Sequence, residues 1–62
     1  MTVKELNREQ IIQLKCSLLD LINQEKGEGT SYEELAKADS LVSDQEVYEY
    51  YEGYDFVPDD FN

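Results

Sequence analysis

Three glutamates recur at three-residue steps near the end of the chain: Glu46, Glu49 and Glu52. Such steps bring side chains to one face of an α-helix, where like charges destabilise the helix by roughly 0.2–0.5 kcal/mol per pair. Residues 44–52 contain no Lys or Arg that could offset this repulsion. An acidic helix face of this kind could neutralise the positive charges of a basic surface on another protein.

The acidic character extends well beyond these three residues. The first 31 residues carry four basic and five acidic side chains, the last 31 carry one and ten, and the net charge is -10. Such a field repels nucleic acid and anionic membranes and attracts basic protein surfaces. We therefore expect a basic protein surface as the partner, with no direct nucleic-acid binding and no membrane contact. The expected partner-binding residues are Asp44, Glu46, Glu49, Glu52 and Asp55.

The same carboxylates have other interpretations. A solvated acidic face can serve only to keep a small protein soluble. Divalent cations would need an EF-hand loop or another dense spacing of oxygen ligands, and the sequence has neither. Asp59 and Asp60 could exchange protons with a substrate, but adjacent carboxylates in a tail lack an enclosed pocket. With no His and one Cys, we expect no enzymatic activity, no metal and no cofactor.

Helix-capping residues mark where three helices should begin. Asn7 and Gln10 form a capping box that starts a helix near residue 8, and Gly27 supplies a stop after it. Ser31 and Ser43 each stand three residues before a glutamate and open two further helices. The sequence therefore predicts an all-α fold, a small three-helix domain with helices at about 8–25, 32–38 and 44–52, formed by the whole chain 1–62.

The last ten residues, 53–62, are expected to form an irregular tail rich in aromatic and acidic residues. Gly53 stands where a helix C-terminus favours a left-handed residue, and Pro58 prevents the helix from continuing. We expect Phe56, Val57 and Phe61 to pack the tail onto the domain. The remaining core is expected to comprise Leu14, Leu18, Leu21, Ile22, Leu35, Leu41, Val47, Tyr50, Tyr51 and Tyr54.

The first helix has a second apolar ridge, formed by Ile12, Cys16 and Leu19 at helical spacing. The folded-back tail could cover this ridge through Phe56 and Phe61. Alternatively, the ridge is displayed and forms a homodimer or a partner contact. The second option makes the chain a structural, self-associating module whose charge serves solubility alone. A reactive Cys16 is disfavoured, because no His or helix N-terminus lies near it in sequence.

A single cysteine cannot form an internal disulfide, which small secreted domains normally need. No signal-peptide core and no stretch of roughly 20 apolar residues is present. We therefore expect a cytoplasmic location.

Residues 31–51, SYEELAKADSLVSDQEVYEYY, resemble the helix-turn-helix of DNA-binding proteins. The likeness lies in two serine-capped helices joined by a hydrophobic turn. The turn DSLVS is longer than usual and lacks the common glycine. The second helix is acidic where DNA contacts require basic or amide groups, so DNA binding does not carry over.

A second resemblance covers nearly the whole chain. The segments KELNREQ, YEELAKADSLVSDQEVYEYY and FVPDDF resemble small, uncharacterised acidic proteins of phages and conjugative elements of Gram-positive bacteria. The resemblance implies a bacterial cytoplasm and a mobile-element role, and it supplies no functional residues. We expect a non-enzymatic binding module or inhibitor. It would act as a DNA mimic, of the anti-restriction or anti-CRISPR type, where the basic surface normally holds nucleic acid.

Overall fold

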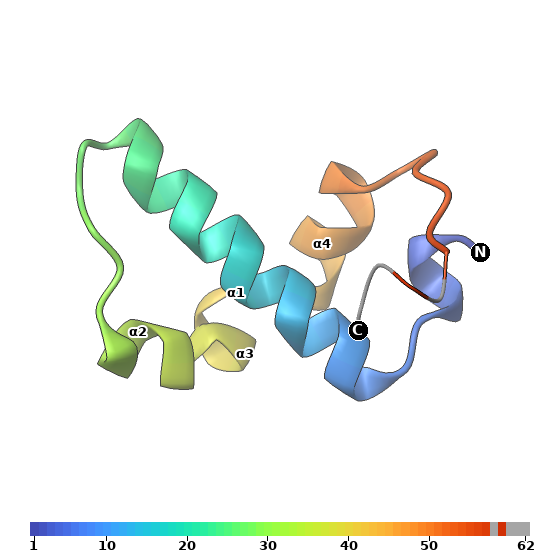
Figure 1. Ribbon diagram of the computed structural model, residues 1–62, viewed down its shortest axis with the longest axis horizontal. Helices are drawn as coiled ribbons and strands as arrows, with labels where there is room; N and C mark the ends of the chain where they lie inside the picture. Colours follow the sequence, from blue (N-terminus) through green and yellow to red (C-terminus); the bar gives the residue numbers. More distant parts are fainter. Residues whose placement is uncertain (58, 60–62) are drawn as a thin grey trace.

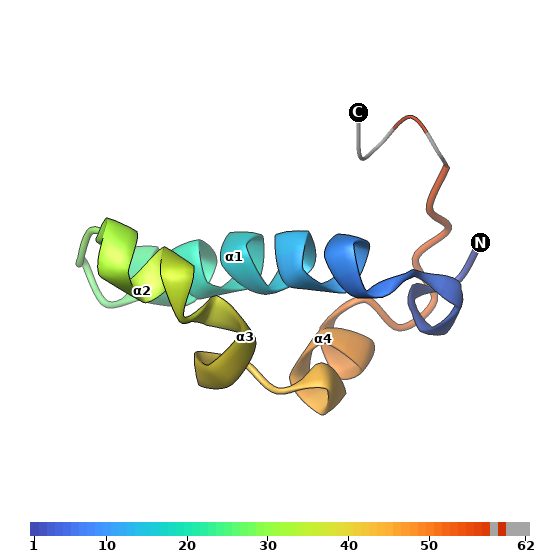
Figure 2. The same cartoon turned by 90° about the horizontal axis from the view of Figure 1, so that it is seen from below.

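The computed structural model describes residues 1–57 and 59, and this part of the chain is helical without any strand. The elements, in order, are the 3-10 turn η1 (Val3–Glu5) and the helices α1 (Arg8–Glu25), α2 (Tyr32–Ala36), α3 (Ala38–Leu41) and α4 (Asp44–Tyr50). Helix α1 runs along the molecule, whose longest extent is 31 Å (Figure 1). Figure 2 shows α3 and α4 on the same side of α1. The predicted all-α class is confirmed.

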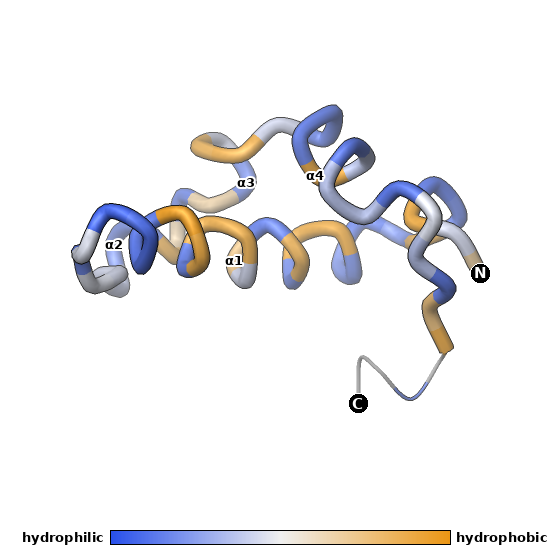
Figure 3. The backbone as a smooth tube through the Cα atoms, turned by 90° about the horizontal axis from the view of Figure 1, so that it is seen from above, coloured by the Kyte–Doolittle hydropathy of each residue, from blue (hydrophilic) through white to orange (hydrophobic). Residues whose placement is uncertain are grey.

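The boundaries of α1 agree with the prediction of 8–25. The Asn7 side chain accepts a hydrogen bond from the Gln10 backbone N–H at 2.9 Å, and the Gln10 side chain accepts one from the Asn7 N–H at 2.9 Å. At the other end, Gly27 has a φ of 76°, a left-handed conformation that glycine adopts without strain. Hydrophobic and hydrophilic stretches alternate along the α1 tube, as in an amphipathic helix (Figure 3).

The predicted helix 32–38 is interrupted. Helix α2 ends at Ala36, Lys37 leaves the helical conformation, and the one-turn helix α3 occupies part of the segment expected as a turn. The physical reason is burial: Ala38 and Val42 are 0 % and 1 % exposed, so the chain changes direction at Lys37 to bring both into the core. The extra helical turn is a further difference between residues 31–51 and a helix-turn-helix motif.

Helix α4 ends at Tyr50, two residues before the predicted end, and Gly53 has the expected left-handed φ of 79°. The next residues are irregular, and Phe56 is buried. Its N–H donates to the Met1 carbonyl at 2.8 Å, which ties the tail to the N-terminus. Val57 is exposed, and the expected packing of Phe61 falls outside the described residues.

Four residues of the predicted core, Leu21, Leu41, Tyr50 and Tyr54, are exposed, and Ile22, Leu35 and Tyr51 are half-buried. Helix α4 is too short to cover the second half of α1, which leaves Leu21 and Tyr50 at the surface. Ala38 of α3 and Val42 just after it take the inward positions, while Leu41 is exposed. The buried apolar residues are Val3, Leu6, Ile11, Leu14, Leu18, Leu19, Ala38, Val42, Val47 and Phe56.

Turn η1 was not predicted. The Glu5 side chain accepts hydrogen bonds from the Thr2 N–H at 3.2 Å and from the Thr2 hydroxyl at 3.1 Å. This turn places Val3 in the core beside Leu6. The signal was present in the sequence, because Thr2 and Glu5 have capping-box spacing.

Candidate functional site

Two residues of the chain fix the position of α4. The Ser43 hydroxyl accepts a hydrogen bond from the Glu46 N–H at 3.1 Å, which caps the helix. Val47 is 0 % exposed and anchors one side of α4 in the core. The opposite side of α4 therefore faces outward and carries Glu46 and Glu49, and Glu52 follows just beyond the helix end. All three side chains are exposed. We call these three residues the acidic face.

Asp44, which was expected to contact a partner, is paired within the protein instead. It lies 2.7 Å from the Lys15 ammonium and 2.9 Å from the Arg8 guanidinium. The hydrogen bonds from these two cations hold the pKa of Asp44 below its usual value. Asp39 completes this ionic cluster by accepting hydrogen bonds from Lys15 at 2.7 Å and from Arg8.

The ionic cluster joins α1 to α3 and α4. The Arg8 and Lys15 side chains donate hydrogen bonds that lower the pKa of Asp39 to about 2. Lys15 is 2 % exposed, and burial opposes its positive charge. The hydrogen bonds with Asp39 and Asp44 outweigh that effect, so the pKa of Lys15 is raised. Sequence reasoning missed this cluster because Lys15 lies among apolar residues and its partners lie far along the chain.

Asp55 is also paired within the protein. Its carboxylate lies 2.8 Å from the terminal amine of Met1, and hydrogen bonding to that amine lowers the pKa of Asp55. The same amine donates to the Phe56 carbonyl at 2.7 Å. Asp44 and Asp55 therefore contribute their charge to internal contacts.

The acidic face differs from these aspartates because, in the described part of the chain, no cation lies within ion-pairing distance of it. None of the ion pairs within residues 1–57 and 59 involves Glu46, Glu49 or Glu52. The polar contacts of the first two are neutral: Ser43 donates to Glu46 at 3.3 Å, and the Gln45 amide donates to Glu49 at 3.2 Å. Of the five predicted contact residues, these three form no ion pair in the described part of the chain.

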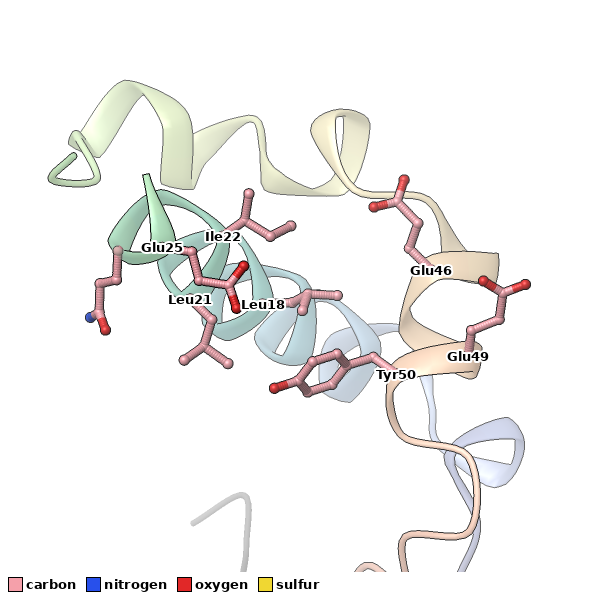
Figure 4. Close-up of a pocket in the computed structure, with 8 residues that line it drawn as sticks. Leu18, Leu21, Ile22, Glu25, Glu46, Glu49 and Tyr50 are labelled. Carbon is pink, nitrogen blue, oxygen red and sulfur yellow. The ribbon is translucent and has the colours of Figure 1, made fainter. Parts of the chain in front are cut away.

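An open groove of about 640 Å³ separates α4 from the second half of α1. In Figure 4, the Tyr50 ring extends from α4 toward Leu18 and Leu21 of α1, while Glu46 and Glu49 project from α4 in other directions, with Glu49 pointing away from α1. The groove therefore combines an apolar floor with carboxylates on its rim. We call this feature the α1–α4 groove, and its lining residues are Leu18, Leu21, Ile22, Gln24, Glu25, Glu46, Glu49 and Tyr50.

A smaller hollow of about 150 Å³ lies on the other side of α4, lined by Gln45, Tyr48, Glu49, Glu52 and Lys4 of η1. The Lys4 ammonium lies 5.9 Å from the centre of the Tyr48 ring, within the range of a cation–π contact. Glu49 thus borders both hollows. The acidic face continues from the α1–α4 groove to this second hollow.

The apolar ridge of α1 is only partly displayed. Leu19 is 7 % exposed and belongs to the core, while Ile12 and Cys16 are half-buried. The Cys16 thiol lies 3.8 Å from the Leu35 carbonyl of α2. The α2 segment therefore covers part of this ridge beside Cys16. The alternative cover by Phe61 of the tail falls outside the described residues.

The chemistry available at this site is electrostatic and apolar. Within the described residues, no group of three or more His, Cys, Asp or Glu side chains is arranged to hold a metal ion. Over the same residues, no helix is long and apolar enough to cross a membrane. No protein-family model, curated protein or solved structure matches the chain.

Proposed function

We propose that the chain is a non-enzymatic protein-binding module whose acidic face engages a basic surface of another protein. The observation that carries this proposal is the contrast between two sets of carboxylates. Asp39, Asp44 and Asp55 form ion pairs with cations of the chain, whereas the exposed acidic face forms none within residues 1–57 and 59. A basic partner would supply the missing cations, and its approach would be accelerated by the net charge of -10.

A narrower form of this function is inhibition by DNA mimicry in a bacterial cytoplasm, of the anti-restriction or anti-CRISPR type. At a rise of 1.5 Å per residue, Glu46 and Glu49 are separated by about 4.5 Å along α4, slightly more than one base-pair step of duplex DNA, and Glu52 follows just beyond the helix end. The acidic face could therefore occupy a short segment of a phosphate-binding groove. The resemblance to proteins of phages and conjugative elements agrees with an inhibitor of this kind.

The alternative function, self-association through Ile12, Cys16 and Leu19, needs these residues at the surface. Leu19 lies in the core, so this ridge offers little apolar area to a second copy. The oligomeric state in solution, measured by sedimentation at high protein concentration, tests this alternative.

The proposal is tested by capture of proteins from a lysate of a Gram-positive bacterium on the immobilised chain. The test variant carries Glu46→Gln, Glu49→Gln and Glu52→Gln. The control variant carries Glu9→Gln, Glu28→Gln and Glu33→Gln, which remove the same charge at exposed positions elsewhere. We expect basic proteins to be retained by the wild type and the control at low salt, and to be lost from the test variant. Equal retention by both variants would show that the acidic face does not select the partner.

A further inference from the structure

The α1–α4 groove is bordered by two facing helix stripes. On α1, Leu18, Leu21, Ile22 and Glu25 follow the spacing of one helical face. On α4, Glu46, Glu49 and Tyr50 do the same. Helix α4 has seven residues and α1 has eighteen, so the stripe on α1 continues past the end of its neighbour. The stripe on α1 therefore has room beside it for a further helix.

Apolar side chains are exposed on both sides of this groove. Leu21 is 40 % exposed and Tyr50 is 57 % exposed, and both line the same hollow. Single exposed apolar residues are ordinary on protein surfaces, but a contiguous hollow with an apolar floor is typical of a binding site. Its volume of about 640 Å³ is large enough to receive several side chains of a partner.

The charges on the rim specify what kind of occupant fits. Glu25 stands on the α1 side, and Glu46 and Glu49 stand on the α4 side. No ion pair in the described part of the chain involves any of these three residues. A purely apolar occupant would strip water from these carboxylates without replacing its hydrogen bonds, which is unfavourable. An occupant that presents cations on both sides of its apolar surface would replace these hydrogen bonds and neutralise the carboxylates.

We propose that the α1–α4 groove binds an amphipathic basic helix of another protein. This inference rests on the proposed function and specifies the form of its partner. Apolar residues of the guest, spaced at positions i, i+3 or i+4 and i+7, pack on Leu18, Leu21 and Tyr50. Lys or Arg residues flanking that apolar face pair with Glu25 on one side and with Glu46 and Glu49 on the other. The bound helix would pack against α1 beyond the point where α4 ends.

The probe is a peptide of Leu and Lys with its Leu residues on one helical face, about 14 residues or roughly 21 Å of helix. The control peptide has the same composition, with Leu distributed around the helix. Calorimetry measures both affinities, and amide chemical shifts of the labelled chain locate the bound peptide. We expect the amphipathic peptide to bind at least about tenfold more tightly than the control, a difference of roughly 1.4 kcal/mol. The largest shifts are expected at Leu21, Ile22 and Tyr50.

Two variants of the chain locate the binding site. Leu21→Gln removes apolar surface from the groove, and Leu41→Gln removes it at a similarly exposed leucine that does not line the groove. We expect Leu21→Gln to weaken binding of the amphipathic peptide by about tenfold and Leu41→Gln to leave it unchanged. Circular dichroism of both variants confirms that they remain folded.

Three results would overturn the inference. Equal affinity for both peptides, with both weakened by Glu46→Gln and Glu49→Gln, would leave the proposed function standing and remove the helix-binding groove. If replacement of Glu25, Glu46 and Glu49 by Gln left the affinity for the amphipathic peptide unchanged, this result would contradict both the charge pairing and the proposed function. A dimer that Leu21→Gln dissociates would identify a second copy as the occupant.

Discussion

At the scale of single residues, two sets of acidic side chains in this protein have different partners. Asp39 and Asp44 form ion pairs with Lys15 and Arg8, and Asp55 forms one with the terminal amine. In the acidic face, Glu46 and Glu49 accept hydrogen bonds from the neutral Ser43 and Gln45 side chains. The first set joins parts of the fold, and the second set is the one that we propose to act between molecules.

Lys15 is the residue on which the ionic cluster depends. Lys15→Met keeps most of the buried stem but leaves Asp39 and Asp44 with Arg8 as their remaining cation in the cluster. We expect a loss of about 1–3 kcal/mol in the free energy of unfolding, limited because the two carboxylates can regain water. Urea denaturation measures this loss. The control is Lys37→Met, at an exposed lysine, which should change the free energy of unfolding little. An equal effect of both variants would contradict a specific role of Lys15.

The depressed pKa values predict sensitivity to acid. The pKa of Asp39 falls from 3.8 in the unfolded chain to about 2 in the fold, because Arg8 and Lys15 donate hydrogen bonds to its charged form. A lowered pKa stabilises the fold above the unfolded value, and this contribution is lost as the pH falls through the folded value. Thermal unfolding followed by circular dichroism should therefore show a melting temperature that drops between about pH 4 and pH 2.

The matched variant for this prediction is Asp39→Asn. It should lower the melting temperature at neutral pH and make the decline below pH 3.8 shallower, because one of the titrating groups is gone. A decline as steep as that of the wild type would mean that other carboxylates control the acid response.

At the scale of elements, helix caps made much of the fold predictable. Asn7, Ser31 and Ser43 form the predicted caps, and Gly27 and Gly53 have the predicted left-handed conformation. Caps are local, since donor and acceptor lie within three residues of one another, and a sequence displays them directly. Where a helix is interrupted depends on distant packing, which is why the break at Lys37 was not predicted.

The cap of α4 can be tested by Ser43→Ala. Loss of the hydrogen bond from the Glu46 N–H should reduce the free energy of unfolding by about 0.5–2 kcal/mol. Ser17→Ala, at an exposed position in the middle of α1, is the control, where alanine should be neutral or slightly stabilising. Chemical denaturation compares the two variants. If both behaved alike, the cap would contribute nothing to the position of the acidic face.

The candidate site was only partly predictable. The acidic face follows from the three-residue steps of Glu46, Glu49 and Glu52. The pairing of Asp44 with Lys15 joins residues 29 positions apart and leaves no local signal. The α1–α4 groove depends on where α4 ends relative to α1, and the periodicity of Leu21 and Tyr50 predicted burial instead. Apolar spacing identifies a helix face but does not say whether another element reaches far enough to cover it.

At the scale of the whole molecule, one face of the second half of α1 and the outward side of α4 are exposed, with Leu21 and Tyr50 at the surface. The other faces of α1 contact α3 and α4, and Asn23 hydrogen-bonds Glu34 of α2. With Leu19 buried and a net charge of -10, we expect no self-association. The proposed binding of a different, basic protein agrees with this distribution.

Sedimentation at high protein concentration tests the oligomeric state. We expect a monomer, because two copies would bring their acidic surfaces together and Leu19 offers no exposed area for contact. Leu19→Glu should then unfold the protein rather than dissociate it, since it would place a charge in the core. A wild-type dimer converted by Leu19→Glu into a folded monomer would instead favour self-association through the α1 ridge.

The salt dependence of partner binding tests the central claim most directly. The affinity for the captured basic partner is measured between about 50 mM and about 300 mM salt. Three proteins are compared: the wild type, the acidic-face variant with Gln at positions 46, 49 and 52, and the control variant with Gln at positions 9, 28 and 33. We predict a steep loss of affinity with salt for the wild type and the control, and a weaker, flatter response for the acidic-face variant, because fewer ion contacts then compete with salt. The same affinity and the same salt slope for all three chains would contradict binding through the acidic face.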